Sequence, residues 1–490
     1  MKSICLCMIL KNEGHIIERC LNSVKNIIDT YVICDTGSTD DTKDKIKNFF
    51  DKCGIKGIIY DHQWVNFGVN RNMLLQAAKN KADYLLLVDA DYVINVHDKN
   101  FKQNLDKASY LIKWEGDLDY RNIKLIRSDL EWKYFCPTHE YLRCLNENEN
   151  PTSFNISTNV ISITEYCDGG CRDNKFKRDI DLLLNEININ PNDPDISRYY
   201  FYLARSYEDL KDYENALIYY EKRANIEGFA EEIYFAKYKC GICKIMLKYS
   251  FEDISETLSN AYNYRPTRLE AIYSLVTYCT DNKFYNAGYL FGKNASKTLY
   301  PINDILFIEK SIHTYLFKIN YGICAYYAGK YDDAIFVFME LLLLCNDIPN
   351  DTKYIVIRNI LFCLSKIANY KYDVDVICNE LFEIYKNNQY QDKNIKYINE
   401  ILIFCRNSKL FDICYYFGIK LLNENQTNED IIKIKDEMGI CAYYLGKYQE
   451  SIDLCNDILI LDINGVHKNR MQVHIDFSMT KLNQISYNPL

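Results

Sequence analysis

Two aspartates, Asp89 and Asp91, follow an apolar run that begins at Tyr84, in the segment YLLLVDAD. A continuous apolar run is typical of a strand that is buried on both faces of a parallel sheet. Such a strand delivers both carboxylates to the carboxyl edge of the sheet, where open α/β sheets bind their ligands. Oxygen ligands suit Mg²⁺ or Mn²⁺, and such an ion would hold a phosphorylated substrate. The alternative is a solvated acidic turn, because D-x-D is a short motif.

Polar segments at the same predicted edge follow two earlier strands. The run 4–10 is followed by Asn12 and Glu13, and the run 31–34 is followed by DTGSTDD, which begins at Asp35. Strands that alternate with helices predict βαβ units, whose loops meet at one edge of the sheet. Within the second segment, Asp40 is expected to cap the helix that follows.

Arg71 lies near the start of a predicted helix over 67–78. A cation there opposes the helix dipole, so it does not serve helix stability. It could instead face an anion at the sheet edge, and the alternative is an ion pair on the surface.

Four blocks in this order resemble a family 2 glycosyltransferase of the GT-A fold, in particular members whose catalytic domain is followed by tetratricopeptide repeats. The blocks are KNEGHIIERCLNSV, VICDTGSTDDT, FGVNRNMLLQAA and DYLLLVDAD. The resemblance implies that Asp35 contacts the nucleotide base and that Asn12 and Glu13 line the nucleotide pocket. It also places Arg71 on the nucleotide-facing helix. Asp89 and Asp91 match the DxD motif, with Asp91 the better candidate for direct metal contact.

A later block, Trp132 followed by PTHEYL at 137–142, resembles the segment that closes the catalytic domain of the same relatives. A base must remove the proton of the acceptor hydroxyl, and a carboxylate or an imidazole can do so. Glu140 is the candidate base. His139 is the alternative base, a further ligand of metal or diphosphate, or a structural histidine. Asp117 and Asp119 are alternative carboxylates, and Trp132 is expected to be a sugar-stacking or core residue.

The rest of the chain contains an internal repeat. LARSYEDLKDYENAL, YGICAYYAGKYDDAI and MGICAYYLGKYQESI are versions of one unit. An aromatic or apolar residue marks the turn of each copy at 213, 249, 284, 331, 372, 410 and 448, with gaps of 35 to 47 residues. This is close to the tetratricopeptide period and predicts stacked helical hairpins with one continuous core. The surface of such a solenoid could bind a protein partner, a second copy of the chain, or an acceptor glycan.

Length and composition predict two domains in a soluble, cytoplasmic protein. A chain of 490 residues exceeds one ordinary core. We expect an α/β GT-A catalytic domain with a Rossmann-like mixed sheet over 1–172, and an all-α, tetratricopeptide-like solenoid over 173–490. A net charge of −9 argues against nucleic-acid binding. The twenty scattered cysteines are expected to be reduced, and the run 4–10 is too short to span a membrane.

The predicted function is a metal-dependent, inverting transfer of a sugar from a nucleotide diphosphate sugar to an acceptor hydroxyl on a glycan or protein. A UDP-sugar is the expected donor, and Mn²⁺ or Mg²⁺ the expected cofactor. One alternative is a non-catalytic tetratricopeptide scaffold with a degenerate transferase domain. Another is a different metal-dependent nucleotide enzyme, such as a nucleotidyltransferase. The donor sugar, the acceptor and the oligomeric state are left open.

Overall fold

The computed structural model describes residues 1–115, 121–146, 153–169, 174–344, 348–367, 374–387, 391–424 and 426–487. The chain forms two compact units, Met1–Leu247 and Lys248–Leu490. The first contains the sheet with its covering helices and also the first helices of the repeat region. The second contains helices and their connecting turns.

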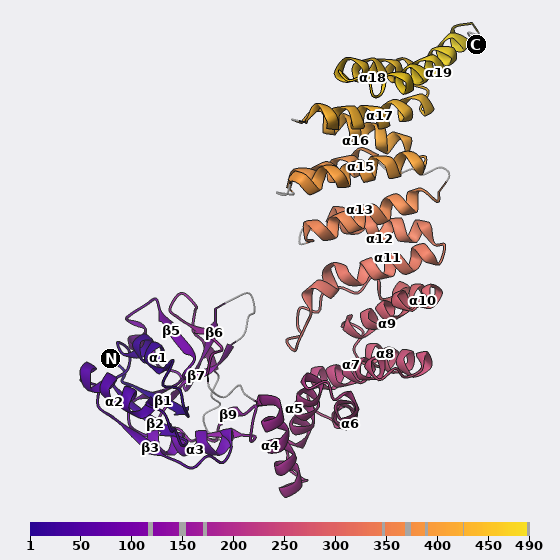
Figure 1. Ribbon diagram of the computed structural model, residues 1–490. Helices are drawn as coiled ribbons and strands as arrows, with labels where there is room; N and C mark the ends of the chain where they lie inside the picture. Colours follow the sequence, from indigo (N-terminus) through magenta and orange to yellow (C-terminus); the bar gives the residue numbers. More distant parts are fainter. Residues whose placement is uncertain are drawn as a thin grey trace. The chain divides into compact units, whose positions relative to one another are not determined.

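The first unit is built on one mixed sheet with the strand order β3-β2-β1-β4-β7-β6-β11-β5 (Figure 1). The pairs β3–β2, β2–β1 and β1–β4 are parallel. Strand β7 is antiparallel to both of its neighbours, β4 and β6. Because β2, β1 and β4 are parallel neighbours, the loops that follow them meet at one edge. The strands are β1 Ile4–Leu10, β2 Thr30–Asp35, β3 Gly57–Asp61, β4 Tyr84–Leu87, β5 Tyr92–Val96, β6 Ser109–Trp114, β7 Arg121–Arg127, β10 Ser153–Asn155, which pairs with β6, and β11 Ile161–Glu165.

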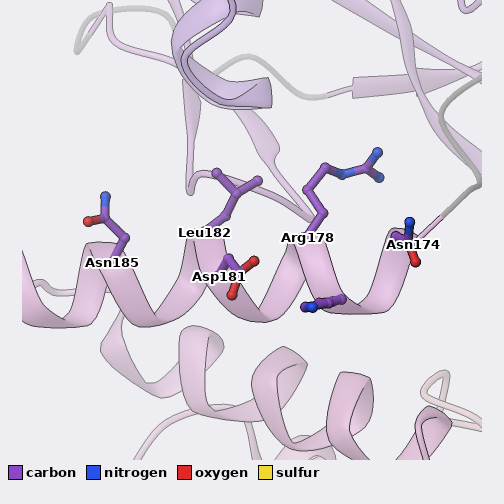
Figure 2. Close-up of a pocket in the computed structure, with 6 residues that line it drawn as sticks. Asn174, Arg178, Asp181, Leu182 and Asn185 are labelled. Atoms are coloured by element: carbon purple, nitrogen blue, oxygen red, sulfur yellow. The ribbon is translucent and has the colours of Figure 1, made fainter.

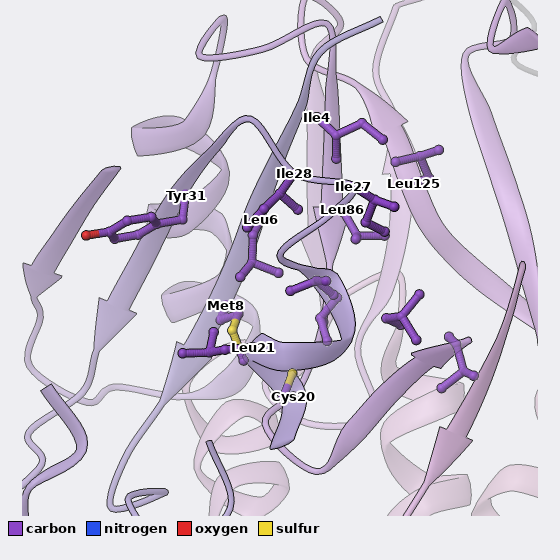
Figure 3. Close-up of a cluster of buried hydrophobic side chains, with 14 of the residues drawn as sticks. Ile4, Leu6, Met8, Cys20, Leu21, Ile27, Ile28, Tyr31, Leu86 and Leu125 are labelled. Carbon is purple, nitrogen blue, oxygen red and sulfur yellow. The ribbon is translucent and has the colours of Figure 1, made fainter. Parts of the chain in front are cut away.

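Both faces of the sheet are covered, as the apolar run of β1 predicts. The even-numbered residues of β1, starting with Ile4, pack with α1 (Ile17–Val24) and α2 (Thr42–Cys53) (Figure 3). The odd-numbered residues, starting with Cys5, pack with α3 (Phe67–Ala78) on the opposite face. Strand β4 is likewise buried along its whole length, but it ends at Leu87, so the two aspartates lie in the turn that follows.

A separate hairpin, β8 (Trp132–Phe135) and β9 (Tyr141–Cys144), packs beside α3. It is followed, after β10 and β11, by α4 (Lys175–Ile189) and α5 (Ile196–Asp209). Two more helices, α6 (Tyr213–Ala224) and α7 (Ala230–Met246), complete the first unit.

The second unit confirms the predicted helical repeat. Most of its helices pack against the next helix along the chain, and Figure 1 shows them stacked in successive layers. They are α8 Phe251–Tyr264, α9 Glu270–Asp281, α10 Tyr285–Ala295, the π-helix η2 Ile312–Leu316, α11 Phe317–Tyr327, α12 Tyr331–Leu344, α13 Asn350–Leu364, α14 Val374–Asn387, α15 Gln391–Asn407, α16 Phe411–Leu422, α17 Asn428–Tyr444, α18 Tyr448–Leu461 and α19 Lys468–Tyr487.

The turn marks read from the sequence coincide with helix starts. The second helices of the hairpins begin at Tyr213, Phe251, Tyr285, Tyr331, Val374, Phe411 and Tyr448, each within two residues of its mark. The mark at 372 itself lies outside the described residues.

Most of these turns share one hydrogen-bonded form. Lys409 has a φ of 63°, its N–H donates to the carbonyl of Arg406 at 3.1 Å, and the N–H of Leu410 donates to that of Cys405 at 2.8 Å. Gly446 adopts the same left-handed conformation and the same pair of bonds in its own turn. Such a motif satisfies the last carbonyls of one helix and reverses the chain toward the next. The repeated Lys-Tyr and Gly-Lys-Tyr signatures therefore mark turns in which an α-helix ends at a residue in the left-handed conformation.

The predicted boundary between residues 172 and 173 stays a prediction. Secondary structure does change there, because β11 ends at Glu165 and α4 begins at Lys175. By compactness, however, α4 to α7 belong with the sheet. Among the described helices, none is long and apolar enough to cross a membrane. The cysteines in the same ranges are all unpaired, and most are buried.

Candidate active site

A cleft of about 750 Å³ opens at the carboxyl edge of the sheet. It brings together five residues that the sequence singled out: Asn12, Glu13, Arg71, Asp89 and Asp91. Asp35, His139 and Glu140 are not among its lining residues. The remaining lining residues are Ile9, Leu10, Lys11, Thr36, Trp64, Phe67, Ala90, Tyr92, Glu165, Gly169, Lys175, Phe176 and Arg178.

The loops after β1 and β2 are tied to each other through Asn12. Its Oδ1 accepts a hydrogen bond from the N–H of Thr39 at 2.8 Å, and its own N–H donates to Ser38 Oγ at 2.9 Å. Asn12 has a φ of 56°, a conformation that asparagine tolerates better than most residues. Asp40 accepts from the N–H groups of Thr42 and Gly14, both at 3.1 Å. The N-cap position of α2 is Asp41, and Asp40 lies one residue before it and accepts from the first N–H of the helix.

Asp35 is fully buried at the end of β2, behind the cleft-lining Thr36. Its Oδ1 accepts from the N–H groups of Gly37 at 2.9 Å and Ser38 at 2.8 Å. Its Oδ2 is buried without a hydrogen-bond partner in the described part of the chain. A buried carboxylate oxygen without a donor is costly, so such an atom calls for an explanation.

Arg71 joins the motif aspartate to the candidate base. Its Nη2 donates to Asp89 Oδ1 at 2.9 Å, and its Nε donates to Glu140 Oε1 at 2.6 Å. Burial alone would lower the pKa of Arg71, but Asp89 and Glu140 raise it well above its usual value. The guanidinium therefore stays charged between two carboxylates.

Lys124, from β7, is a second cation beside Asp89, with its Nζ 3.8 Å from Asp89 Oδ2. Burial would raise the pKa of Asp89, yet Arg71 and Lys124 lower it to about 2. Burial in turn lowers the pKa of Lys124. Lys124 was not selected from the sequence. The signal that could have identified it is a lysine within the otherwise apolar strand segment IKLI, where the structure buries the side chain.

The FGVNRN block holds the β8–β9 hairpin against α3. A Cβ on Gly68 would lie 2.2 Å from the carbonyl oxygen of Cys136, so only glycine permits this approach. The N–H of Phe67 donates to the carbonyl of Pro137 at 3.0 Å. The side chain of Asn72 exchanges two hydrogen bonds with the backbone of Tyr134, at 2.9 and 2.8 Å. These contacts fix the hairpin that carries Glu140 relative to the helix that carries Arg71.

The two candidate bases have different surroundings. The side chain of Glu140 is 15% exposed and contacts Arg71, which lines the cleft. The ring of His139 stacks on Tyr202 of α5 with a centroid distance of 4.0 Å, and its Nε2 lies 3.6 Å from Asp179 Oδ2. Burial lowers the pKa of His139 to about 3, and Lys175, Arg205 and Arg198 contribute to the shift. His139 is therefore neutral at pH 7 and faces α4 and α5.

Two other candidates have simple outcomes. Trp132 packs against the core on the α3 side of the sheet, and its Nε1–H donates to the carbonyl of Arg127 at 3.0 Å. It does not line the cleft. Asp117 and Asp119 lie outside the described residues.

A divalent cation fits the cleft if the substrate supplies part of its coordination shell. A Cβ on Gly169 would lie 3.5 Å from Asp91 Oδ2 and 3.6 Å from Glu13 Oε1, so both carboxylates face one small space. The described residues contain no cluster of three or more His, Cys, Asp or Glu arranged to hold a metal. One or two carboxylates together with substrate phosphates are the usual protein site for Mg²⁺. Asp89 is paired with two cations, Arg71 and Lys124.

The first part of the chain is similar in sequence to known glycosyltransferases. Residues 5–100 match the family model described as glycosyl transferase family 2. The first unit contains a family 2 glycosyltransferase domain. The chain is 26% identical over 258 residues to the SPbeta prophage-derived glycosyltransferase SunS of Bacillus subtilis, an alignment that covers 49% of this chain and 58% of the relative. It is 28% identical over 196 residues to an uncharacterized glycosyltransferase of Rickettsia felis, covering 38% and 61%. The chain thus spans somewhat more than half the length of these relatives.

Solved structures include two further similarities. The crystal structure of S. aureus TarS is 12% identical, covers 52% of this chain and 54% of that one, and has a TM-score of 0.33. The C-terminal part of a TPR repeat-containing protein from Cytophaga hutchinsonii is also 12% identical, covers 59% and 92%, and has a TM-score of 0.32.

Helix α4 adds residues to the glycosyltransferase cleft that sequence analysis had assigned to the repeats. Lys175, Phe176 and Arg178 line it directly. Arg178 also borders a second pocket of about 400 Å³ along α4, and Figure 2 shows it projecting from the same side of the helix as Leu182. These residues carry no motif, and only the fold brings them to the sheet edge.

Two further lining residues, which lie in or shortly after strands toward opposite ends of the sheet, were not identified from the sequence either. Trp64 follows β3, and Glu165 ends β11 with its Oε2 accepting from the indole N–H of Trp114 at 3.2 Å. A carboxylate at the end of a strand is the signal that could have identified Glu165.

Proposed function

We propose that this chain transfers a sugar from a UDP-sugar to a hydroxyl group of a glycan or protein acceptor, with inversion at the anomeric carbon and with Mn²⁺ or Mg²⁺ as cofactor. The observation that supports this most strongly is the cleft itself. Five predicted site residues line it, and they come from the loop after β1, from α3 and from the turn after β4. All five lie inside the segment 5–100 that matches the family 2 model, on the edge where such sheets bind ligands. Relatives that bear the glycosyltransferase name support the same class.

Asp35 is proposed to select the base. The N3–H of uracil is a hydrogen-bond donor, and the buried Oδ2 of Asp35 has no donor of its own in the described residues. Cytosine has no hydrogen at N3, so the same oxygen would favour UDP over CDP. Asn12 and Glu13 would line the nucleotide pocket beside it.

Asp91 would hold the divalent cation against the diphosphate. When bound, the cation would neutralise the negative charge that develops on the departing UDP. Arg71 directs its charge toward the same region, and Asp89 holds the guanidinium in place at 2.9 Å.

Glu140 is proposed as the base. It accepts the proton of the acceptor hydroxyl while that oxygen bonds to the anomeric carbon, on the face opposite to the diphosphate. The bond from the anomeric carbon to the phosphate oxygen breaks, and its electron pair leaves with UDP. Arg71 orients Glu140 through the hydrogen bond at 2.6 Å. His139, stacked against Tyr202, is proposed to support the loop rather than to move the proton.

Calorimetric titration with UDP, with and without Mn²⁺, tests the donor site. We expect binding that strengthens with Mn²⁺ and weakens in Asp35→Ala. A scaffold with a degenerate transferase domain would bind no UDP in a metal-dependent manner. A panel of nucleotide sugars then tests the reaction class: release of free UDP supports transfer, whereas release of pyrophosphate would indicate a nucleotidyltransferase.

The helical repeats are proposed to bind the acceptor, a protein partner or a second copy of the chain. Light scattering of the purified chain tests for binding of a second copy, because a homodimer has twice the monomer mass of 57.8 kDa. We also propose that the protein acts in the cytoplasm, consistent with its unpaired cysteines.

A further inference from the structure

The loop that carries Glu140 is attached to α4 and α5 on both sides of that residue. Before it, Thr138 Oγ1 donates to Asp179 Oδ1 at 3.0 Å, and the carbonyl of His139 accepts from Arg198 Nη2 at 2.9 Å. After it, the hydroxyl of Tyr141 donates to the carboxylate of Asp195 at 3.1 Å. The contacts come from α4, from α5 and from the residue just before α5.

The same loop adopts an uncommon backbone conformation. Cys136 has a φ of 72° and His139 a φ of 51°, and neither is a glycine. Left-handed non-glycine residues are strained and persist only where the surroundings enforce them. Here α3 contacts the loop at Gly68 on one side, and Tyr202 and Arg198 hold His139 on the other.

Two further observations link this helix pair to the cleft. Lys175, Phe176 and Arg178 of α4 line the cleft itself. The whole pair also belongs to the same compact unit as the sheet.

We propose that the first helical hairpin, α4 and α5, is a positioning element of the active site, and that Asp195 and Arg198 are positioning residues that hold the Glu140 loop in its reactive geometry. This rests on the proposed function, because it takes Glu140 as the base. It follows that the functional transferase extends beyond its sheet into the repeat region, at least to α5.

Substitutions at the two contacts test this in the full-length chain. Arg198→Met removes both donors to the His139 carbonyl, and Asp195→Ala removes the acceptor of the Tyr141 hydroxyl. Arg198→Lys keeps a donor for the His139 carbonyl, and Asp195→Asn keeps an acceptor for the Tyr141 hydroxyl. Leu217→Ala, a buried change in α6, is the control for general destabilisation of the helices.

The activity readout is UDP release from UDP-glucose and UDP-N-acetylglucosamine with Mn²⁺, first with water as acceptor. We expect kcat to fall about 10- to 100-fold in Arg198→Met and Asp195→Ala, because a shift of about 1 Å in the position of the Glu140 carboxylate can have this effect. KM for the donor should change less than about threefold. The conservative variants should recover most of kcat, and Leu217→Ala should lower Tm without the selective loss of kcat.

Hydrogen–deuterium exchange provides a readout that does not need turnover. The peptide covering 134–144 should exchange faster in Arg198→Met than in wild type or Arg198→Lys, while the peptide covering 31–41 is unchanged. Unchanged exchange and unchanged kcat in Arg198→Met and Asp195→Ala would overturn the proposal. An equal loss of kcat in Leu217→Ala would do so too.

Different results would contradict the proposed function. Full activity in Glu140→Gln would remove Glu140 as the base, and absence of UDP release in wild type would remove the reaction. In either case the exchange measurement still decides whether α4 and α5 hold the loop.

Discussion

Two buried arginine clusters, one in each unit, use the same chemistry in different settings. In the first unit Arg71 pairs with Asp89 and Glu140. In the second unit Arg268 pairs with Glu270 at 2.9 Å and lies 3.5 Å from Asp304. The arginine side chains are 12% and 1% exposed, respectively.

The cluster in the repeats is closed and serves the fold. Arg268 also donates to the carbonyls of Leu306 and Phe307, both at 3.1 Å, and Arg265 donates to both oxygens of Asp304 at 2.6 Å. These bonds fasten the segment between α10 and η2, which accounts for the longest gap between turn marks. The cluster thus anchors an insertion in the repeat.

The cluster around Arg71 is open on one side. Arg71 and Asp89 both line the cleft, beside the carboxylates of Asp91 and Glu13. A buried ion pair by itself is weak support for either stability or function. What separates these two clusters is access to a cleft that contains further charged groups.

The largest effect is expected at the open cluster. Asp91→Ala should reduce metal-dependent transfer roughly 1000-fold, because loss of the cation removes several kcal/mol of charge stabilisation. Tm should stay within about 2 °C of wild type. Turnover with Mn²⁺ is compared with that of Asp51→Ala, an exposed carboxylate on α2. Retained metal-dependent turnover in Asp91→Ala would remove the distinction between the two clusters.

At the closed cluster the effect should fall on stability instead. Arg268→Met leaves Glu270 buried without its arginine partner, which we expect to cost about 3 to 5 kcal/mol of unfolding free energy. Denaturant unfolding measures this, with Lys433→Met as the control because its pair with Glu429 is exposed. UDP binding by the first unit should be unchanged. A loss below about 1 kcal/mol would mean that the cluster does not anchor the repeat.

The pH dependence of the same cluster is the next test. Burial would raise the pKa of Glu270, but hydrogen bonds from His313 and Arg268 lower it to about 2, below its ordinary value of 4.5. A carboxylate with a lowered pKa in the folded state stabilises the protein above its unfolded pKa, and this contribution is lost as pH falls. We expect the wild type to lose stability between pH 4.5 and 2, and Glu270→Gln to lose less over that window. Parallel pH curves for both proteins would contradict the assigned ionisation.

The smallest effect is expected at two turns between repeat helices, where the backbone conformation of a single residue determines the change in unfolding free energy. Lys409 and Gly446 occupy equivalent left-handed positions, but only glycine does so without steric cost. Lys409→Gly should raise the unfolding free energy by up to about 1 kcal/mol, and Gly446→Ala should lower it by a similar amount. Denaturant unfolding of both variants measures the difference. Changes of the same sign in both variants would show that the two turns are not equivalent.

The repeats and the first strands could be predicted from the sequence because their signals are local. Strand β1 was identified with its observed bounds, since a run buried on both faces is apolar at every position. The turn marks located helix starts because a left-handed residue, followed within two residues by an aromatic residue or a leucine, recurs in the six copies whose turns the structure describes. The parallel order of β1, β2 and β4 then brought Asn12, Glu13, Asp89 and Asp91 to one cleft, as expected.

Only the tertiary structure determined what surrounds those residues. The contact between Arg71 and Glu140 joins positions 69 apart in the chain, and Lys124 reaches Asp89 from an antiparallel strand. The neutral state of His139 depends on burial against α5, and the partnerless oxygen of Asp35 depends on the turn folded over its other oxygen. Local patterns specify which residues face inward, but not which distant segment meets them. Sheet order and helix docking decide that, and in this protein they bring residues of α4 into the wall of the cleft.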